Sequence, residues 1–118
     1  MKAKDVLGAK GEELACDHLT AIGCTIIDRN WRCEFGEIDI VARHESTLIV
    51  VEVKTRSSLR HGEPVEAVSA RKVRRLRRLA LCWLDAHAIH APFIRIDVIG
   101  ILRRADGSIA LRHLTGVE

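Results

Sequence analysis

The sequence has 118 residues, of which 47% are hydrophobic and 30% are charged, and its formal net charge is +3. A chain of this length builds one hydrophobic core, so we expect a single domain over residues 1–118. No apolar run approaches the roughly 18 residues of a membrane span, and the amino terminus lacks the apolar core of a signal peptide. These features argue against a membrane protein and favour a cytoplasmic location.

The cysteines and histidines do not follow the spacing of a zinc site. The four cysteines contain no C-x-x-C pair, which argues against a zinc ribbon. In a cytosolic protein we expect reduced thiols that fill small gaps in the core. Among the six histidines, His87 and His90 lie three residues apart near a predicted helix end and are a weak candidate for a metal site. The cysteines are Cys16, Cys24, Cys33 and Cys82.

Hydrophobic periodicity predicts a first helix over residues 4–22, with Ala15, Leu19 and Ile22 on one face. Gly23 ends this helix, because glycine tolerates the left-handed conformation that follows a helix. Alternating apolar residues then predict three strands. They cover residues 24–31, 35–43 and 47–54.

The second half of the chain begins with a long helix. Ser69 suits its N-cap, and the apolar pattern runs to about His87. Residues 93–102 and 108–114 are two further strands joined by an Asp-Gly turn. The order α-β-β-β-α-β-β predicts an α/β fold with one mixed central sheet flanked by helices.

The segment "GEIDIVARHESTLIVVEVKTR", residues 36–56, places acids and a lysine inside its most strand-like sequence. Alternation puts Ile38 on the same face as Ile40 and Ala42, and puts the acids with Val41 on the other face. A two-residue turn at positions 45–46 would bring the charged residues opposite one another, with Cβ atoms roughly 4.5–5.5 Å apart. The predicted pairs are Asp39 with Glu52 and Glu37 with Lys54.

Two carboxylates at that separation repel each other, and burial increases the cost. A divalent cation would relieve the repulsion, and oxygen ligands in this number suit Mg²⁺ or Mn²⁺. Lys54 could then orient an attacking water or stabilise charge on a phosphate. The alternative is an exposed edge hairpin with a polar outer face. Against that alternative, "LIVVEV" (residues 48–53) is apolar on both faces, which is typical of a central strand.

Asp39, twelve intervening residues and then Glu52-Val53-Lys54 resemble the PD-(D/E)xK pattern of restriction-endonuclease-like nucleases, with Ile38 in the usual proline position. In archaeal Holliday-junction resolvases of this fold, a glutamate on the first helix completes the metal site. The resemblance therefore offers Glu12 or Glu13. Helical geometry places Glu12 about 20° from Leu19 and Glu13 about 100° further round. We expect Glu12 to be the third acid, the alternative being an acid that interacts with the helix dipole.

The motif set as a whole is similar to the bacterial YraN family over nearly the whole chain. It comprises G-x-x-G-E, "RNWR", "GEIDIVA", "VVEVKTR" and "EAV" before a basic helix. The resemblance implies a single restriction-endonuclease-like domain. It also places Glu37 and Arg56 at motif positions, which implies a supporting role for Glu37 beside Lys54 and a phosphate contact for Arg56.

The run "RKVRRLRR", residues 71–78, puts four arginines at i, i+3, i+4 and i+7, along about 10 Å of one helix face. That spacing suits a phosphate backbone, although such contacts carry no sequence code. The alternative is a solvated face. The arginines are Arg71, Arg74, Arg75 and Arg78; Val73, Leu76, Leu79, Ala80 and Trp83 are expected on the packed side.

These observations predict a metal-dependent nuclease that hydrolyses phosphodiester bonds in nucleic acid. Glu12, Asp39 and Glu52 would hold Mg²⁺ or Mn²⁺, and Lys54 would complete the catalytic set. DNA is expected rather than RNA, and the resolvase analogy favours branched or structured DNA and a homodimer. The alternative is a non-catalytic nucleic-acid-binding or partner-docking module with the same fold.

Overall fold

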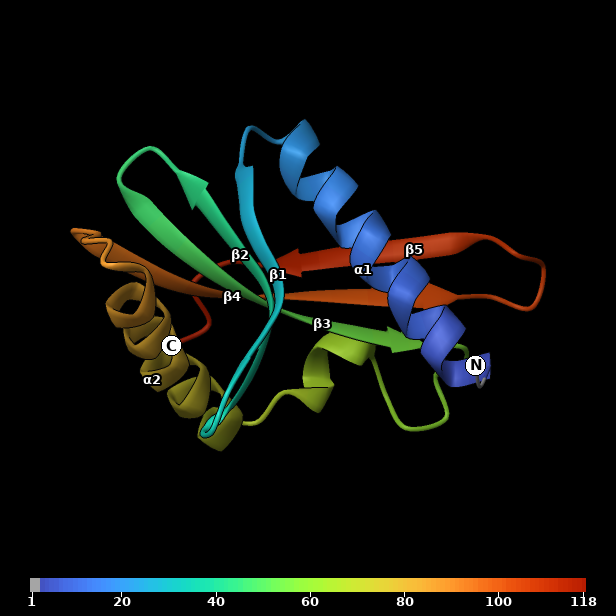
Figure 1. Ribbon diagram of the computed structural model, residues 1–118. Coiled ribbons are helices and arrows are strands. Elements are labelled where there is room, and N and C mark those ends of the chain that lie inside the picture. Colours follow the sequence, from blue (N-terminus) through green and yellow to red (C-terminus); the bar gives the residue numbers. More distant parts are fainter. Residues whose placement is uncertain (1–2) are drawn as a thin grey trace.

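The computed structural model describes residues 3–118, with side chains from Val6 onward; the first two residues of the predicted domain lie outside this range. The described residues form five strands, two α-helices and one short 3₁₀ helix (Figure 1). The predicted element order is confirmed. The elements are α1 (Ala3–Ala21), β1 (Thr25–Cys33), β2 (Gly36–His44), β3 (Thr47–Arg56), η1 (Pro64–Ala67), α2 (Ala70–His87), β4 (Phe93–Arg103) and β5 (Ile109–Leu114).

The five strands make one mixed sheet in the order β1-β2-β3-β4-β5. Only β3 and β4 pair in parallel, and α2 with η1 forms the crossover between them. As its apolar sequence predicts, β3 is the central strand. Both helices pack on this sheet, and in Figure 1 α1 lies on the side away from α2.

Each helix closes a separate half of the core. On the α2 side, Leu76, Leu79 and Trp83 pack on Leu48 and Val50, which confirms the predicted buried face of this helix. On the α1 side, a second set of buried side chains forms the core. They include Ala15, Cys16, Leu19, Cys24, Ile49, Val51 and Ile99.

One end of each helix can be compared with the sequence prediction: the start of α2 agrees with it and the end of α1 does not. Ser69 caps α2, its Oγ accepting a hydrogen bond from the backbone N–H of Lys72 at 3.1 Å. Ile22 was expected on the packed face of α1 but is 51% exposed, because the helix ends at Ala21 and Gly23 turns the chain away with φ +98°.

The four cysteines, all within the described residues, are free thiols, as predicted.

Gly11 sets how closely α1 approaches the central strand. A Cβ added to this buried glycine would lie 2.1 Å from Oγ1 of Thr55 on β3, so no larger residue fits without moving the helix. Gly8, three residues earlier, faces open space. The close contact fixes the height of the next residue, Glu12, above the sheet.

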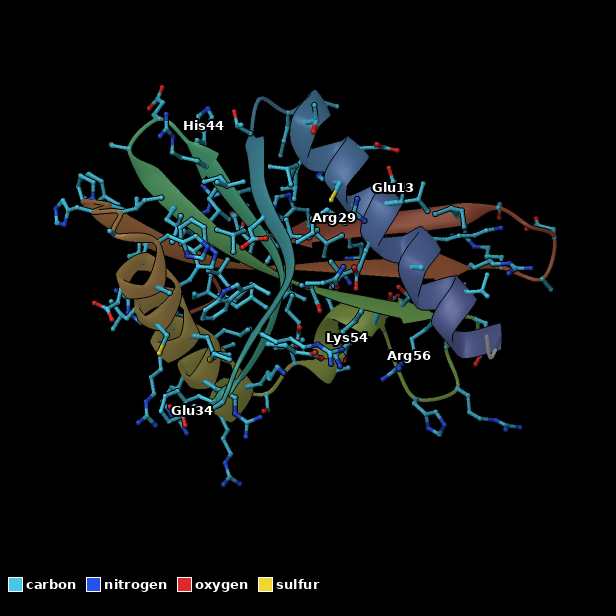
Figure 2. The ribbon with its side chains drawn as sticks, viewed as in Figure 1. Glu13, Arg29, Glu34, His44, Lys54 and Arg56 are labelled. Carbon is cyan, nitrogen blue, oxygen red and sulfur yellow. The ribbon has the colours of Figure 1, made fainter. Side chains whose placement is uncertain are left out.

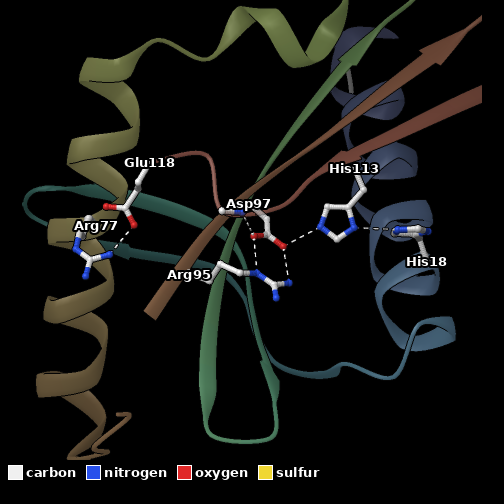
Figure 3. Close-up of polar contacts among 7 residues, drawn as sticks. His18, Arg77, Arg95, Asp97, His113 and Glu118 are labelled. Atoms are coloured by element: carbon white, nitrogen blue, oxygen red, sulfur yellow. Dashed lines mark hydrogen bonds and ion pairs between the residues drawn. The ribbon is translucent and has the colours of Figure 1, made fainter. Parts of the chain in front are cut away.

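A buried acid ties the carboxyl-terminal segment to the sheet (Figure 3). Asp97 on β4 is fully buried and accepts two hydrogen bonds from Arg95 and one from the backbone N–H of Gly116. His113 Nε2 lies 2.8 Å from Asp97, and its Nδ1 lies 3.1 Å from His18 Nε2. Burial alone would raise the pKa of Asp97, but the hydrogen bonds from His113, Arg95 and Gly116 outweigh burial and hold the pKa below its usual value.

Neither helix within residues 3–118 has both the length and the apolar character needed to cross a membrane.

Candidate active site

The β2–β3 hairpin opens into a fork at the residues that carry charge. Its turn spans positions 45 and 46, and pairing runs from His44–Thr47 to Ile40–Val51, which confirms the predicted register. Beyond that point the two strands diverge (Figure 1). The backbone N–H of Val53 donates instead to Oδ2 of Asp39 at 2.9 Å. The carboxylate thus takes the place of a backbone carbonyl of β2 as acceptor.

The fork corrects the predicted faces of β2. Ile38 packs with Val41 on the α2 side of the sheet, whereas Ile40 packs on the α1 side, so strict alternation breaks at Asp39. Asn30, facing this position on β1, has a left-handed backbone with φ +52°, a conformation that asparagine tolerates better than most residues. The irregular pair lets Asp39 turn toward β3.

Asp39 and Glu52 form the close carboxylate pair that the sequence predicts. The Glu52 residue is only 5% exposed, and its side chain lies within hydrogen-bonding reach of Asp39. Burial, the hydrogen bond with Asp39 and the charge of Asp39 raise the pKa of Glu52 to about 7. In neutral solution Glu52 therefore carries a proton for much of the time.

Two lysines oppose this rise. Lys72 on the first turn of α2 places Nζ 3.3 Å from Oε2 of Glu52, and its side chain is 31% exposed. Lys54, half-buried two residues along β3, also lowers the pKa of Glu52 by its charge (Figure 2). The sequence prediction missed Lys72 because the basic run was assigned to solvent. The signal was present, since Lys72 precedes the buried Leu76 by four residues and so lies on the packed stripe.

The structure distinguishes the two glutamates of α1. Glu13 is exposed and pairs with Arg29, Oε2 to NH1, at 3.1 Å (Figure 2). Glu12 is half-buried, and burial and the nearby Asp39 carboxylate raise its pKa, while Asn30 and Arg29 lower it. Glu12 is therefore the glutamate of α1 whose charge is felt at the fork.

Glu37 does not reach the position predicted for it. The predicted opposition of Glu37 to Lys54 needs pairing beyond Ile40, where the strands have already separated. Glu37 instead faces β1, where its Oε2 lies 3.1 Å from Nε of Arg32, and its side chain is 54% exposed. Its charge still contributes weakly to raising the pKa of Glu12.

Asp39 lies near each of the other two predicted ligands, Glu12 and Glu52, but the three do not form a finished cation site. Among the described residues, no three His, Cys, Asp or Glu side chains are grouped so as to hold one ion. The oxygens of Asp39 and Glu52 are engaged by Val53 N–H and by Lys72. The donor chemistry nevertheless fits Mg²⁺ or Mn²⁺, because such ions need only one or two carboxylates and keep several waters. His87, the other candidate ligand, stacks on Trp83 and bonds to its backbone carbonyl.

The basic face of α2 is exposed as predicted. Arg71, Arg74, Arg75 and Arg78 all project to solvent, and none of them belongs to an ion pair among the described side chains. Arg77, by contrast, pairs with Glu118. Arg56 is half-buried at the end of β3, and Figure 2 shows it beyond Lys54 along that strand.

A groove lies away from these acids. It has a volume of about 470 Å³ and runs between α1 and the β4–β5 hairpin. Its lining is mostly apolar, with Leu14, Ile101 and Ile109 among its members, and Glu13 is the carboxylate among its described lining residues. It lacks the donors that a hard cation requires.

Comparison with known proteins settles the family. The model of the uncharacterised protein family UPF0102, which is the YraN family, matches residues 11–101. The chain belongs to this family. The match spans Glu12, the fork and the basic helix, so the resemblance stated from the motifs is confirmed.

Relatives of similar length support the assignment. A UPF0102 protein of Beutenbergia cavernae is 53% identical over 99% of both chains. Another, from Paenarthrobacter aurescens, is 52% identical over 99% of this chain and 97% of its own. Among solved structures, Pyrococcus furiosus SfsA in complex with Ca²⁺ is 19% identical with a TM-score of 0.45, over 98% of this chain and 65% of that one.

Because the pKa of Glu52 is raised, we expect the free energy of unfolding of this UPF0102 protein to depend on pH. The folded state holds a proton between pH 4.5 and about 7 that the unfolded chain releases, so wild-type stability should fall as pH rises through this window. The free energy of unfolding of Glu52→Gln, relative to that of wild type, should rise by about 3 kcal/mol between pH 4.5 and pH 8, at about 1.4 kcal/mol per pKa unit. Urea unfolding in EDTA measures this. Parallel curves of unfolding free energy against pH for the two proteins would contradict the raised pKa of Glu52. Glu66→Gln, at an exposed site, is the control.

Proposed function

We propose that this UPF0102 protein is a divalent-metal-dependent endonuclease that hydrolyses phosphodiester bonds in DNA. The observation that carries the proposal is the Asp39–Glu52 pair, in which the buried Glu52 meets the half-buried Asp39 at a strand fork with Lys54 beside them. Perturbed acids with a specific charge partner gather preferentially at functional sites. A purely structural sheet gains nothing from an acid whose pKa is raised by its neighbour.

The carboxyl groups of Asp39 and Glu52 would bind the cation, with Glu12 contributing from α1. A bound Mg²⁺ or Mn²⁺ supplies a Lewis acid and a water of lowered pKa. Binding needs both carboxylates charged, so the proton held by Glu52 must leave. Lys72 must also yield its contact with Glu52, since the cation takes over the neutralisation of that carboxylate.

Lys54 is suited to the chemical step. It lies on β3 two residues from Glu52 and faces the same side of the sheet. From there its ammonium group can orient the attacking water or stabilise the extra negative charge on the phosphate. Arg56, a further two residues along, would contact a neighbouring phosphate. Glu37, paired with Arg32, would act only through its charge.

The arginine face of α2 would hold the DNA backbone. Its four guanidinium groups are solvent-exposed, and α2 also supplies Lys72 to the site, so the binding surface adjoins the chemistry. Phosphate contacts of this kind fix position without reading sequence. Cutting both strands of a branched molecule would need two such sites, which is the basis for proposing a homodimer.

The alternative is a nucleic-acid-binding module without catalysis. The engagement of Asp39 and Glu52 by Val53 and Lys72 favours it, because both carboxylates are satisfied without a metal. The same residues distinguish the two functions, since a binding module needs the arginines and not the acids.

Cleavage assays with matched acids test the proposal. In Mn²⁺ or Mg²⁺, purified protein should cut duplex, flap or four-way DNA, and Asp39→Ala should lose at least about a hundredfold in rate. Glu12→Gln should lose about ten- to a hundredfold, whereas Glu13→Gln, on the same helix but paired outward with Arg29, should retain activity. Cleavage that survives Asp39→Ala would show a contaminating enzyme, and binding without cleavage in either metal would establish the module instead.

The arginine face should make binding depend strongly on salt. Each neutralised phosphate contributes about −0.9 to the slope of log K against log salt. Reversing the four arginines to glutamate should therefore make the slope shallower by about 3 to 4 units. A control protein with four other exposed arginines reversed has the same net charge and should keep the slope; these are Arg60, Arg103, Arg104 and Arg112. Equal losses in both proteins would mean that net charge alone drives binding.

A further inference from the structure

The tip of the β1–β2 hairpin carries a large apolar side chain in solvent. Cys33 pairs with Gly36, so Glu34 and Phe35 form a two-residue turn between the strands. Phe35 is 66% exposed, the most of any large hydrophobic side chain described. Turns of this kind usually carry glycine, asparagine or aspartate. Phe35 therefore contributes little to the core and stands where it can contact a partner.

The turn rests against the basic helix. A Cβ added to Gly36 would lie 3.4 Å from Cδ1 of Leu79 and 3.9 Å from Cδ of Arg75, which places the tip beside the arginine face. Figure 1 shows the same approach of the β1–β2 turn to the first turns of α2, and Figure 2 marks it at Glu34. On the hairpin itself, the side chain of Arg32 is 79% exposed. An exposed aromatic ring thus borders a row of cations.

The tip also lies a fixed distance from the fork. Phe35 lies in the turn directly before β2 and precedes Asp39 by four residues, which corresponds to about 13 Å of extended chain. At 3.4 Å per nucleotide along one strand, that distance spans about four nucleotides. A strand held by the arginines can therefore meet both Phe35 and the acids.

We propose that Phe35 stacks on a base where the DNA stack is interrupted, and that the protein prefers DNA with unpaired bases adjoining a duplex. In an intact duplex both faces of each base are covered by neighbours, so an inserted ring must first separate them. At a fork or flap one face is already free, and stacking on an aromatic ring is tolerant of sequence. Glu34, negatively charged at the same tip, disfavours a phosphate there. This inference rests on the DNA-binding half of the proposed function.

Competition binding in EDTA tests it without cleavage. Wild type should bind a forked duplex about tenfold more tightly than an intact duplex of equal length and charge, the factor that one stacked base contributes. Phe35→Ala should lose this preference and keep its duplex affinity, and Phe35→Trp should restore the preference. Phe93→Ala is the matched control, since Phe93 is 63% exposed at the start of β4.

The outcomes separate this inference from the nuclease proposal. A preference for forks that Phe35→Ala leaves intact, or an equal loss of fork and duplex binding in that variant, would overturn the stacking role. If the preference depends on Phe35 but no cleavage occurs in Mn²⁺, the stacking role stands and the nuclease proposal falls. If cleavage occurs, cuts should lie about four nucleotides from the fork; cuts placed without relation to the fork would count against the assigned geometry.

Discussion

The hydrogen bond from the Val53 backbone to the Asp39 carboxylate is the contact on which the site depends. Where β2 leaves β3, the N–H of Val53 has lost its strand partner, and a buried donor without an acceptor is costly. Asp39, on β2, supplies the acceptor. This hydrogen bond holds its carboxylate against the central strand β3, beside Glu52. One side chain thus both ends the strand pairing and positions an acid, so the fork and the acidic pair arise together.

Two buried acids in this sheet show how environment separates structure from function. Asp97 is fully buried yet its pKa is lowered, because Arg95, His113 and Gly116 all donate to it. Burial raises the pKa of Glu52 to about 7, and the neighbouring Asp39 carboxylate adds to the rise instead of opposing it. The first arrangement holds the carboxyl terminus in place. The second leaves an electrostatic cost that a cation, a substrate phosphate or a proton must offset.

The amino-acid sequence correctly predicted the features that follow from hydrophobic periodicity and turn chemistry. The two-residue turn gave the register, the helical angle selected Glu12 over Glu13, and the arginine spacing gave one exposed face. It failed where a tertiary contact overrides local pattern. Ile38 changes face at the position opposite Asn30, whose backbone is left-handed, and Glu37 turns to Arg32 because the strands have parted. The Asp97 network joins residues far apart in sequence, so no local pattern announces it.

The central claim is that Glu52, beside Asp39, carries a proton which a divalent cation replaces. Calorimetric titration with Mn²⁺ at pH 6.5, in two buffers of different ionisation enthalpy and with a phosphorothioate DNA fork present, tests it most directly. The account predicts binding with release of up to about one proton per ion, from the group whose pKa lies near 7, and loss of that release in Glu52→Gln but not in Glu66→Gln. Binding and proton release that are the same in wild type and Glu52→Gln would contradict it, as would the absence of any Mn²⁺ binding to the wild-type complex.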